Sequence, residues 1–482
     1  MSETLVQRVA AAGGLGFIGL YLVVAVLRIG HPFELEWMEG ALVDHALRIV
    51  DGESLYVAPT LSWIPSLYPP FFFWCGAAAT QVVGEGFFAL RLVSLLASVG
   101  TLSLLWHLAR RETGSQAAGI LAAGAFAATF AAGGAWLDLA RVDSLAIFLS
   151  LLSITLLRHG YRRPAMLAAG AIAAVACFTK QTSFLILTPV FGWALLTKPR
   201  AAIWASGAAL LTGGASLCWL QWTSEGWFTY YALELPPSHA WVPEMWTGFW
   251  VNDVVATVPV LLLFALVGGL CPFWIAVLAG GLGASWLARL HEGGWDNVLL
   301  TGYAALSVPF AIGVHRLSKR LSKARPLLCG IVLWLCLGQF GWLAYDPRPL
   351  VPTHSDREAG ASVVAELSGI DGDILVPNHG YLPRLAGKKT HAHFGCYTDV
   401  IRANIRETGS DLKQDAAAAM RRRAFAAVVL DSDPLAPAVF GQLFPGLLEN
   451  YAPDRFLLPR DSRVLQPVTG APCRPVVLYL PK

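Results

Sequence analysis

The chain has 482 residues, of which 55% are hydrophobic and only 14% are charged. Soluble domains usually carry about 25% charged residues, so this composition excludes an ordinary soluble enzyme and predicts a protein that lies largely in lipid. The 35 basic and 32 acidic residues nearly balance, and a net charge of +3 gives no reason to expect nucleic acid as a partner.

Apolar runs long enough to cross a membrane recur through the first 345 residues. A spanning helix needs about 20 mostly apolar residues. Such runs are centred near residues 20, 98, 125, 150, 172, 190, 211, 259, 280, 306 and 335, and they predict eleven transmembrane helices. No small-residue cleavage pattern follows the first run, which favours a retained anchor over a cleaved signal.

One further apolar stretch, residues 68–83, opens with two prolines and is rich in aromatic residues. If this stretch lies in the membrane interface, the basic clusters at 110–111, 158–163, 198–200 and 316–325 all fall on the cytoplasmic side. We therefore expect a multi-pass protein of the cytoplasmic membrane with a cytoplasmic N-terminus. The chain between the first two spans is then one long outer loop, and most acids before residue 346 lie on the outer face.

The composition becomes that of a soluble protein after Tyr345. We divide the chain into a transmembrane domain, 1–345, and a periplasmic or extracellular domain, 346–482. Periodicity predicts a small α/β fold, with helices over 357–367 and 410–423 and strands over 373–376, 426–430 and 476–480.

Two features of this second domain bear on function. Its only cysteines are Cys396 and Cys473, which could pair in an oxidising compartment. A group of basic residues could bind an acceptor glycan, although exposed basic residues are more often simply solvated. This group consists of Arg384, Lys388, Lys389 and His391.

Three carboxylates, Glu34, Glu36 and Glu39, stand directly after the first apolar run. If a helix begins near Glu36, then Glu36 and Glu39 share a face of it. Val43, Leu47 and Val50 then continue an apolar stripe that can lie on lipid. Carboxylates in this position can bind a hydroxyl, an amine or a metal. They are also commonly plain helix caps, stabilised by the helix dipole.

A second group of charges, Asp138, Arg141 and Asp143, stands where the third span meets the fourth. Charges at membrane depth cost about 2.5 to 3.5 kcal/mol each on insertion scales, so they are usually paired and often functional. The alternative is an ion pair of Arg141 with Asp138 or Asp143 that merely locks two helices.

Later outer segments add further polar candidates. Lys180 interrupts an apolar stretch, and it is either a snorkelling end residue or a point charge for a phosphate. His291 and Asn297 lie in a turn before the tenth span, where they serve a tight loop or bind a polar head group. The aromatic residues of 222–250 predict an interfacial belt, part of which could line a prenyl groove or stack on a sugar.

Taken in order, these motifs resemble the GT-C superfamily of membrane glycosyltransferases that use polyprenyl-phosphate sugars. The resemblance is to the branch of lipid A aminoarabinose transferase and protein O-mannosyltransferases. In that family an acidic motif follows the first span and an interfacial helix with a proline motif precedes the second. The corresponding segments here are Glu34–Glu39, Tyr68–Trp74, Ala140–Asp143, Thr179–Lys180 and Asn297–Leu299.

The chain departs from the family pattern at two places. The first-loop motif of the family typically carries an aspartate, whereas this chain has only glutamates, so Glu36 is the first choice for the catalytic role and Glu39 the second. Tyr68 stands where aminoarabinose transferases place a lysine. The phosphate contact is therefore expected from Lys180 or Arg141.

The resemblance implies a polytopic α-helical GT-C-like fold of about eleven transmembrane helices, with interfacial helices in the first outer loop and the small C-terminal α/β domain. It implies inverting transfer of a sugar from a polyprenyl-phosphate donor to an envelope glycan, lipid or protein at the outer face of the membrane. No cofactor is required, and a divalent metal is compatible with the carboxylates without being demanded. The expected substrate-binding residues are Glu34, Tyr68, Asp138, Arg141, Asp143, Lys180, His291 and Asn297.

Other functions compete with this interpretation. The same charges could form the pathway of a lipid-linked glycan or lipid transporter or flippase, but the hydropathy pattern does not repeat between halves and the charges gather at one face. A glycan polymerase or ligase is a second alternative, although its main soluble loop would more naturally lie between spans. A third is a pseudo-enzyme whose C-terminal domain binds glycan.

Overall fold

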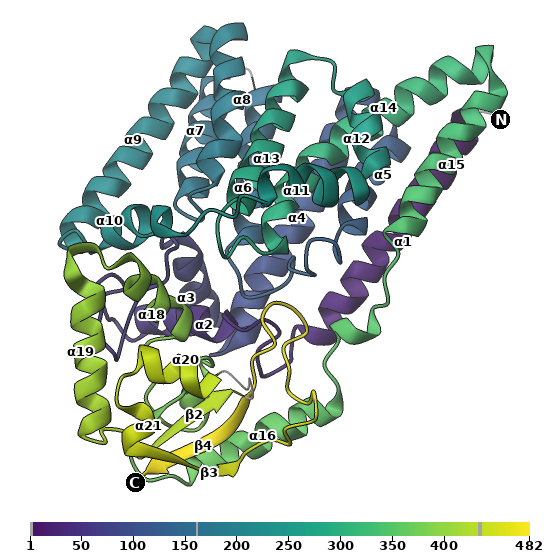
Figure 1. The fold of residues 1–482 in the computed structure, drawn as a ribbon. Coiled ribbons are helices and arrows are strands. Elements are labelled where there is room, and N and C mark those ends of the chain that lie inside the picture. Colours follow the sequence, from purple (N-terminus) through teal and green to yellow (C-terminus); the bar gives the residue numbers. More distant parts are fainter. Residues whose placement is uncertain (1–2, 161, 432–435) are drawn as a thin grey trace.

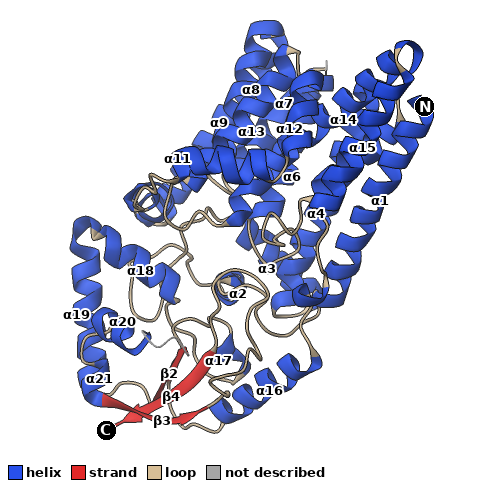
Figure 2. Cartoon of the chain, turned by 45° about the vertical axis from the view of Figure 1, so that its right-hand side comes forward, coloured by secondary structure: helices blue, strands red, loops and turns tan. Residues whose placement is uncertain are grey.

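Helices dominate the chain, and a small sheet lies near its C-terminus. The computed structural model describes residues 3–160, 162–431 and 436–482. Figure 1 shows a body of long helices above a sheet-bearing C-terminal part, and in Figure 2 the strands gather at one end of the molecule, away from these helices. The helices before residue 346 are α1 (Glu3–Arg28), α2 (Glu39–Val50), α3 (Phe71–Val83), α4 (Phe87–Thr113), α5 (Gln116–Ala128), α6 (Asp143–His159), α7 (Arg163–Cys177), α8 (Ser183–Thr197), α9 (Pro199–Thr223), α10 (Trp227–Thr229), α11 (Met245–Gly248), α12 (Pro259–Gly268), α13 (Pro272–Arg289), α14 (Leu299–Ala324) and α15 (Pro326–Trp342).

Several helices are long enough to cross a bilayer, and the chain is an integral membrane protein. Among the described residues, four helical segments are long and apolar enough to cross a membrane. A fifth possible span is the pair of helical segments 245–256 and 259–268, which are bent by 88° relative to each other. All eleven predicted centres lie in helices, but the prediction of eleven full-length spans is not met. The four segments are Leu5–Arg28, Phe87–Thr113, Pro199–Thr223 and Asp296–Ser322.

The shorter helices end where the chain turns into irregular segments. α5 stops at Ala128, and residues 129–142 follow without α-helix before α6 begins. Irregular backbone at membrane depth is tolerated only where protein or a cavity covers it. Residues 129–142 are buried except for the half-buried positions 131, 132 and 134, so protein covers most of this segment. The sequence pattern counts such apolar but irregular residues toward a span, and this is why it overestimates span length.

Two short helices follow α1 in the first outer loop. α3 has 13 residues, about 20 Å at 1.5 Å per residue, which is shorter than a bilayer core of about 30 Å. α2 begins at Glu39 and not near Glu36, so the expectation that these two glutamates share a helix face is wrong. Val43 and Leu47 were expected to face lipid, but they are fully buried against other protein residues, because α2 packs on α3.

Close backbone packing joins α12 to α14. A Cβ atom added at Gly313 would lie 2.0 Å from the carbonyl oxygen of Phe264, and one at Gly268 would lie 2.0 Å from that of Pro309. Glycines that let helix backbones approach are typical of membrane interfaces. These two positions therefore set the distance between the two helices.

We expect Gly313→Ala to lower the melting temperature of the purified protein in detergent, because the added methyl group forces α12 away from α14. Overpacking of this kind costs about 1 to 3 kcal/mol. Gly16→Ala is the matched control, since nothing lies within 4 Å of a Cβ at that helical position. Equal melting temperatures for the two variants would contradict the packing described here.

The C-terminal part has a mixed sheet of order β1-β2-β4-β3, in which β1 pairs parallel with β2 and the other pairs are antiparallel. Its helices and strands are α16 (His354–Ser368), β1 (Ile374–Leu375), α17 (Leu382–Leu385), α18 (Phe394–Ala403), α19 (Thr408–Arg421), β2 (Ala427–Asp431), α20 (Ala436–Leu443), α21 (Leu447–Asn450), β3 (Tyr451–Phe456) and β4 (Pro475–Pro481). Every predicted element of this part is present. The edge strand β3 was not predicted, because its exposed positions include a proline and two charged residues.

Candidate functional site

The irregular segment 129–142 is anchored by a buried ion pair at the end of α1. Arg28 contacts both carboxylate oxygens of Asp138 at 2.7 Å and donates to the backbone oxygen of Ala135 at 2.6 Å. Both side chains of this pair are fully buried. The alternative in which Arg141 pairs with Asp138 is therefore not formed, and Asp138 holds the segment that carries Arg141.

A second buried pair fixes the start of α2. Arg91, from α4, contacts both carboxylate oxygens of Glu39, at 3.0 and 2.6 Å, and the backbone N–H groups of Leu35 and Ala140 each donate to Glu39 at 2.7 Å. Burial would raise the pKa of Glu39, but Arg91 and these donors hold it below its usual value. Each carboxylate oxygen of Glu39 thus accepts two hydrogen bonds. Glu39 joins α4, the loop before α2 and the segment 129–142.

Glu36 lies before α2 and is only partly satisfied. Its Oε2 accepts from Arg141 Nη1 at 3.0 Å and from the backbone N–H of Met38 at 3.2 Å, whereas its buried Oε1 has no partner among the described residues. Burial raises the pKa of Glu36 to about 7, although Arg141 opposes this rise. A carboxylate with a pKa near neutrality can exchange a proton at physiological pH.

Arg141 connects Glu36 to the loop before α3. Its Nη2 donates to the hydroxyl of Tyr68 at 3.1 Å, and its guanidinium lies over the ring of Trp136 at 5.6 Å. Its buried Nε has no partner in the described part of the chain. Arg141 thus comes from the segment 129–142, Glu36 from the loop before α2, and Tyr68 from the loop before α3.

A neighbouring group is centred on Asp143, the first residue of α6. Asp143 Oδ1 accepts from Lys180 Nζ at 2.6 Å and from Asn297 Nδ2 at 2.9 Å, and its buried Oδ2 has no described partner. Arg141 acts electrostatically on both Asp143 and Lys180. The group around Asp143 is therefore a near neighbour of the group formed by Glu36, Arg141 and Tyr68. Lys180 lies between the end of α7 and the start of α8, and its side chain is 14% exposed.

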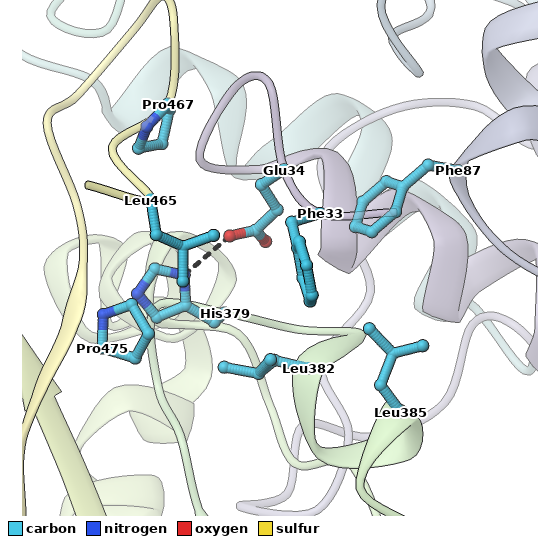
Figure 3. A pocket seen from close by; sticks show the side chains of 9 residues that line it. All are labelled: Phe33, Glu34, Phe87, His379, Leu382, Leu385, Leu465, Pro467 and Pro475. Atoms are coloured by element: carbon cyan, nitrogen blue, oxygen red, sulfur yellow. Dashed lines mark hydrogen bonds and ion pairs between the residues drawn. The ribbon is translucent and has the colours of Figure 1, made fainter. Parts of the chain in front are cut away.

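Glu34 points away from this cluster, toward the C-terminal part. Its Oε2 lies 2.6 Å from Nδ1 of His379, and Nε2 of His379 lies 3.3 Å from Asp431. Figure 3 shows Glu34 and His379 joined at the wall of a cavity that is otherwise lined by apolar side chains and prolines. The cavity holds about 20 Å³, room for about one water molecule.

Other predicted residues lie elsewhere. His291 packs its ring against Trp241 at 5.0 Å and makes no described contact with the charged cluster. Three residues of the basic group on the C-terminal part have partners within the chain: Arg384 pairs with Asp51, Lys388 donates to a backbone oxygen, and His391 packs on Phe425. The fourth, Lys389, is exposed.

The disulfide that the sequence left open is not formed. Cys396 and Cys473 are both free thiols. Cys396 is buried in an apolar cluster on α18, whereas the thiol of Cys473 contacts Asp431 beside the start of β4. The two side chains therefore occupy different environments.

Four residues of these networks were missed: Arg28, Arg91, His379 and Asp431. Arg91 carries a visible signal, because it is a charge inside the long apolar run of α4, and such charges are usually paired. His379 and Asp431 carry none, since the contact between Glu34 and His379 joins residues 345 positions apart. In the described residues, no group of three or more His, Cys, Asp and Glu side chains is arranged to hold a metal ion.

Comparison with known proteins agrees with this architecture. Residues 68–222 match the family described as dolichyl-phosphate-mannose-protein mannosyltransferase. The fold matches ArnT from Cupriavidus metallidurans bound to undecaprenyl phosphate, with a TM-score of 0.59 and 13% identity over 96% of this chain and 97% of ArnT. For ArnT in the apo state the TM-score is 0.60, with the same identity and coverage.

A weaker similarity is to the oligosaccharyltransferase of Archaeoglobus fulgidus, with a TM-score of 0.49 and 11% identity over 91% of this chain and 73% of that one. No curated protein matches the sequence. The family match confirms the resemblance to membrane glycosyltransferases, and the ArnT similarity shows that the shared fold extends over nearly the whole chain.

Proposed function

We propose that this chain, which carries a segment of a membrane glycosyltransferase family on a fold like that of ArnT, transfers a sugar from a polyprenyl-phosphate donor to an acceptor at the outer face of the membrane. One observation carries the proposal. Glu36, Arg141 and Asp143 come from separate segments, and each keeps one buried polar atom without a partner in the described chain. Buried polar atoms are normally bonded, so such a group is poised to bind a polar substrate.

The two cations of the cluster suit a phosphate. Arg141 and Lys180 are now held by Glu36 and Asp143, at 3.0 and 2.6 Å. A donor phosphate would compete for both cations, and fixed positive charge stabilises the phosphate as it departs. ArnT was solved with undecaprenyl phosphate, a polyprenyl phosphate, which supports this class of donor.

Glu36 is the proposed general base. It accepts the proton of an acceptor hydroxyl or amine while that oxygen or nitrogen attacks the anomeric carbon and the bond from carbon to phosphate oxygen breaks. Withdrawal of Arg141 toward the phosphate would free Glu36 Oε2 for this task. A single displacement inverts the configuration at the anomeric carbon. Of the remaining predicted residues, Tyr68 accepts a hydrogen bond from Arg141, and Asn297 donates to Asp143, the partner of Lys180. Glu39 and Asp138 hold the backbone around the site.

The arrangement of the chain in the membrane follows from the same proposal. The site lies where α1, α5 and α7 end, on the side of the C-terminal part, and we place that side outside the cytoplasm with the N-terminus inside. The sugar is already activated by its lipid phosphate, so transfer needs no nucleotide on that side. The acceptor is a glycan, lipid or protein of the cell envelope.

Incubation of the purified protein in proteoliposomes with a panel of polyprenyl-phosphate sugars tests this function. We expect release of free polyprenyl phosphate from at least one donor when an envelope extract supplies the acceptor. A transporter or flippase would move the lipid and release none. Release of no polyprenyl phosphate from any donor of the panel would count against the proposal.

We expect Lys180→Met to raise the KM for the donor by about 10- to 100-fold, since the loss of one charge-assisted contact to a phosphate is worth about 1.5 to 3 kcal/mol. Lys198→Met is the control, because Lys198 lies between α8 and α9 and donates to the backbone oxygen of Arg158. Initial rates measured against donor concentration give the donor KM of each variant. An unchanged donor KM in Lys180→Met would remove Lys180 from the phosphate site.

A further inference from the structure

The C-terminal part grips the segment that carries Glu36. The backbone N–H of Thr469 donates to the carbonyl oxygen of Leu35 at 3.2 Å, and Glu36 and Thr469 form a parallel bridge. A Cβ atom added at Gly470 would lie 3.1 Å from Oε1 of Glu36. These residues belong to the connection between β3 and β4, which in Figure 1 rises from the sheet toward the helical body.

A second contact lies on the C-terminal side of Glu36, at the start of α2. A Cβ atom added at Gly380 would lie 2.6 Å from the backbone nitrogen of Ala41, and one at Gly40 would lie 2.9 Å from that of Tyr381. Two backbones therefore meet directly at the start of α2. The C-terminal part therefore contacts the chain on both sides of Glu36, at Leu35 and at Gly40 and Ala41.

His379 lies beside this contact, between two carboxylates. It is 4% exposed, its Nδ1 lies 2.6 Å from Glu34 and its Nε2 lies 3.3 Å from Asp431. Asn378 donates to the other oxygen of Asp431 at 2.8 Å. Figure 3 shows that Glu34 and His379 come from different parts of the chain and meet at the wall of one cavity.

We propose that His379 is a positioning residue for the glycosyl transfer: as an imidazolium between Glu34 and Asp431, it fixes the loop that holds Glu36 in the site. The C-terminal part then completes the transfer site. This inference rests on the proposed function, in which Glu36 is the base. Glu34, two residues from Glu36, becomes the attachment point of this loop and is no longer expected to bind substrate.

Charge supports the geometric argument. Burial would lower the pKa of His379, but the carboxylates of Glu34 and Asp431 raise it to about 10, so the ring is protonated at neutral pH. Other ionisable groups that interact with this chain of charges are His393, Cys473, Glu39, Asp44 and Arg474.

Glu36 senses the same charges. The charged groups that face it are Arg141 from the segment 129–142, Glu39 from α2, and Glu34 beside it, with Cys473 in the neighbouring β3–β4 connection. Burial raises the pKa of Glu34, and the positive charge of His379 opposes this rise. Without that positive charge, the negative charge of ionised Glu34 is uncompensated and raises the pKa of Glu36.

We expect His379→Gln to lower kcat by about 10²-fold, as a small misplacement of the base would. We also expect the acidic limb of its pH–rate profile to move to higher pH. In Glu34→Gln/His379→Gln both charges are removed, and we expect the limb to return toward the wild-type position. His354→Gln is the matched control, because His354 also pairs with a glutamate, Glu358, but on the exposed face of α16.

The outcomes separate this inference from the proposed function. If the wild type releases polyprenyl phosphate and Glu36→Gln does not, while His379→Gln matches His354→Gln in both kcat and pH profile, the positioning role is wrong and the function stands. If the wild type is inactive with every donor, the function itself fails.

Folding is checked by size-exclusion chromatography and melting temperature for every variant. If His379→Gln does not fold, Asp431→Asn takes its place, because it keeps the contact between His379 and Glu34. This variant loses one of the two carboxylates that hold the ring of His379, and we expect it to lower kcat. A kcat in Asp431→Asn equal to that of His354→Gln would overturn the proposal.

Discussion

Glu36→Gln is expected to lower the rate of sugar transfer by about 10²- to 10⁴-fold, the usual contribution of a general base. Glutamine keeps the size of the side chain and its contact with Arg141, but it cannot accept the acceptor proton. The wild-type kcat/KM should fall below pH 7, because the pKa of Glu36 is raised to about 7 and only its ionised form is a base.

The measurement is transfer by each variant in the same proteoliposomes over a range of pH. Glu53→Gln is the matched control, since Glu53 lies in the same outer loop but its side chain is 56% exposed and pairs at the surface with Arg48. Full transfer by Glu36→Gln, or a profile without an acidic limb near pH 7, would contradict the assignment.

Glu39→Gln should instead destabilise the protein, by about 3 kcal/mol or more, because it leaves Arg91 buried without its partner. The pKa of Glu39 is lowered in the folded state, so its ionised form adds stability above the unfolded pKa, and this stability is lost as the pH falls. The melting temperature of Glu39→Gln should therefore lie well below that of the wild type at pH 8.

Glu36→Gln should have the opposite effect on stability. The pKa of Glu36 rises from 4.5 to about 7 on folding, so its ionisation costs about 3 kcal/mol at pH 8 and nothing below the unfolded value. Its glutamine variant should melt above the wild type at pH 8, with a difference that shrinks from pH 7 to pH 4.5. Two variants that melt alike at pH 8 would show that the two glutamates do not differ in role.

The sequence located the polar cluster because its residues stand beside or within apolar runs. Glu36, Tyr68, Arg141, Asp143, Lys180 and Asn297 all stand at the ends of spans on one predicted side, and the structure brings them together. Charges are costly near lipid, so their mere presence in such runs is informative.

The partners of these charges could not be predicted in the same way. Asp138 stands three residues from Arg141, but the segment between them is not helical, so the two side chains do not share a face and Asp138 pairs with Arg28. Likewise, the predicted span lengths were too long where apolar residues of 129–142 are buried in irregular structure. Such pairings depend on how distant segments pack, which periodicity does not encode.

The same reasoning applies to the C-terminal part. Its predicted helices and strands have local periodicity, and all of them formed. The contact of His379 with Glu34 has no local signature, because a single histidine in a loop is compatible with many environments. The C-terminal part could thus be predicted as a fold but not as a wall of the site.

The central claim is a single displacement at the anomeric carbon, with a polyprenyl phosphate as the leaving group. Transfer from a donor of known anomeric configuration, followed by NMR analysis of the sugar on its acceptor, tests this claim most directly. We predict that free polyprenyl phosphate appears together with a product of inverted configuration, and that both are lost in Glu36→Gln. A product of retained configuration, or transfer without release of polyprenyl phosphate, would contradict the account.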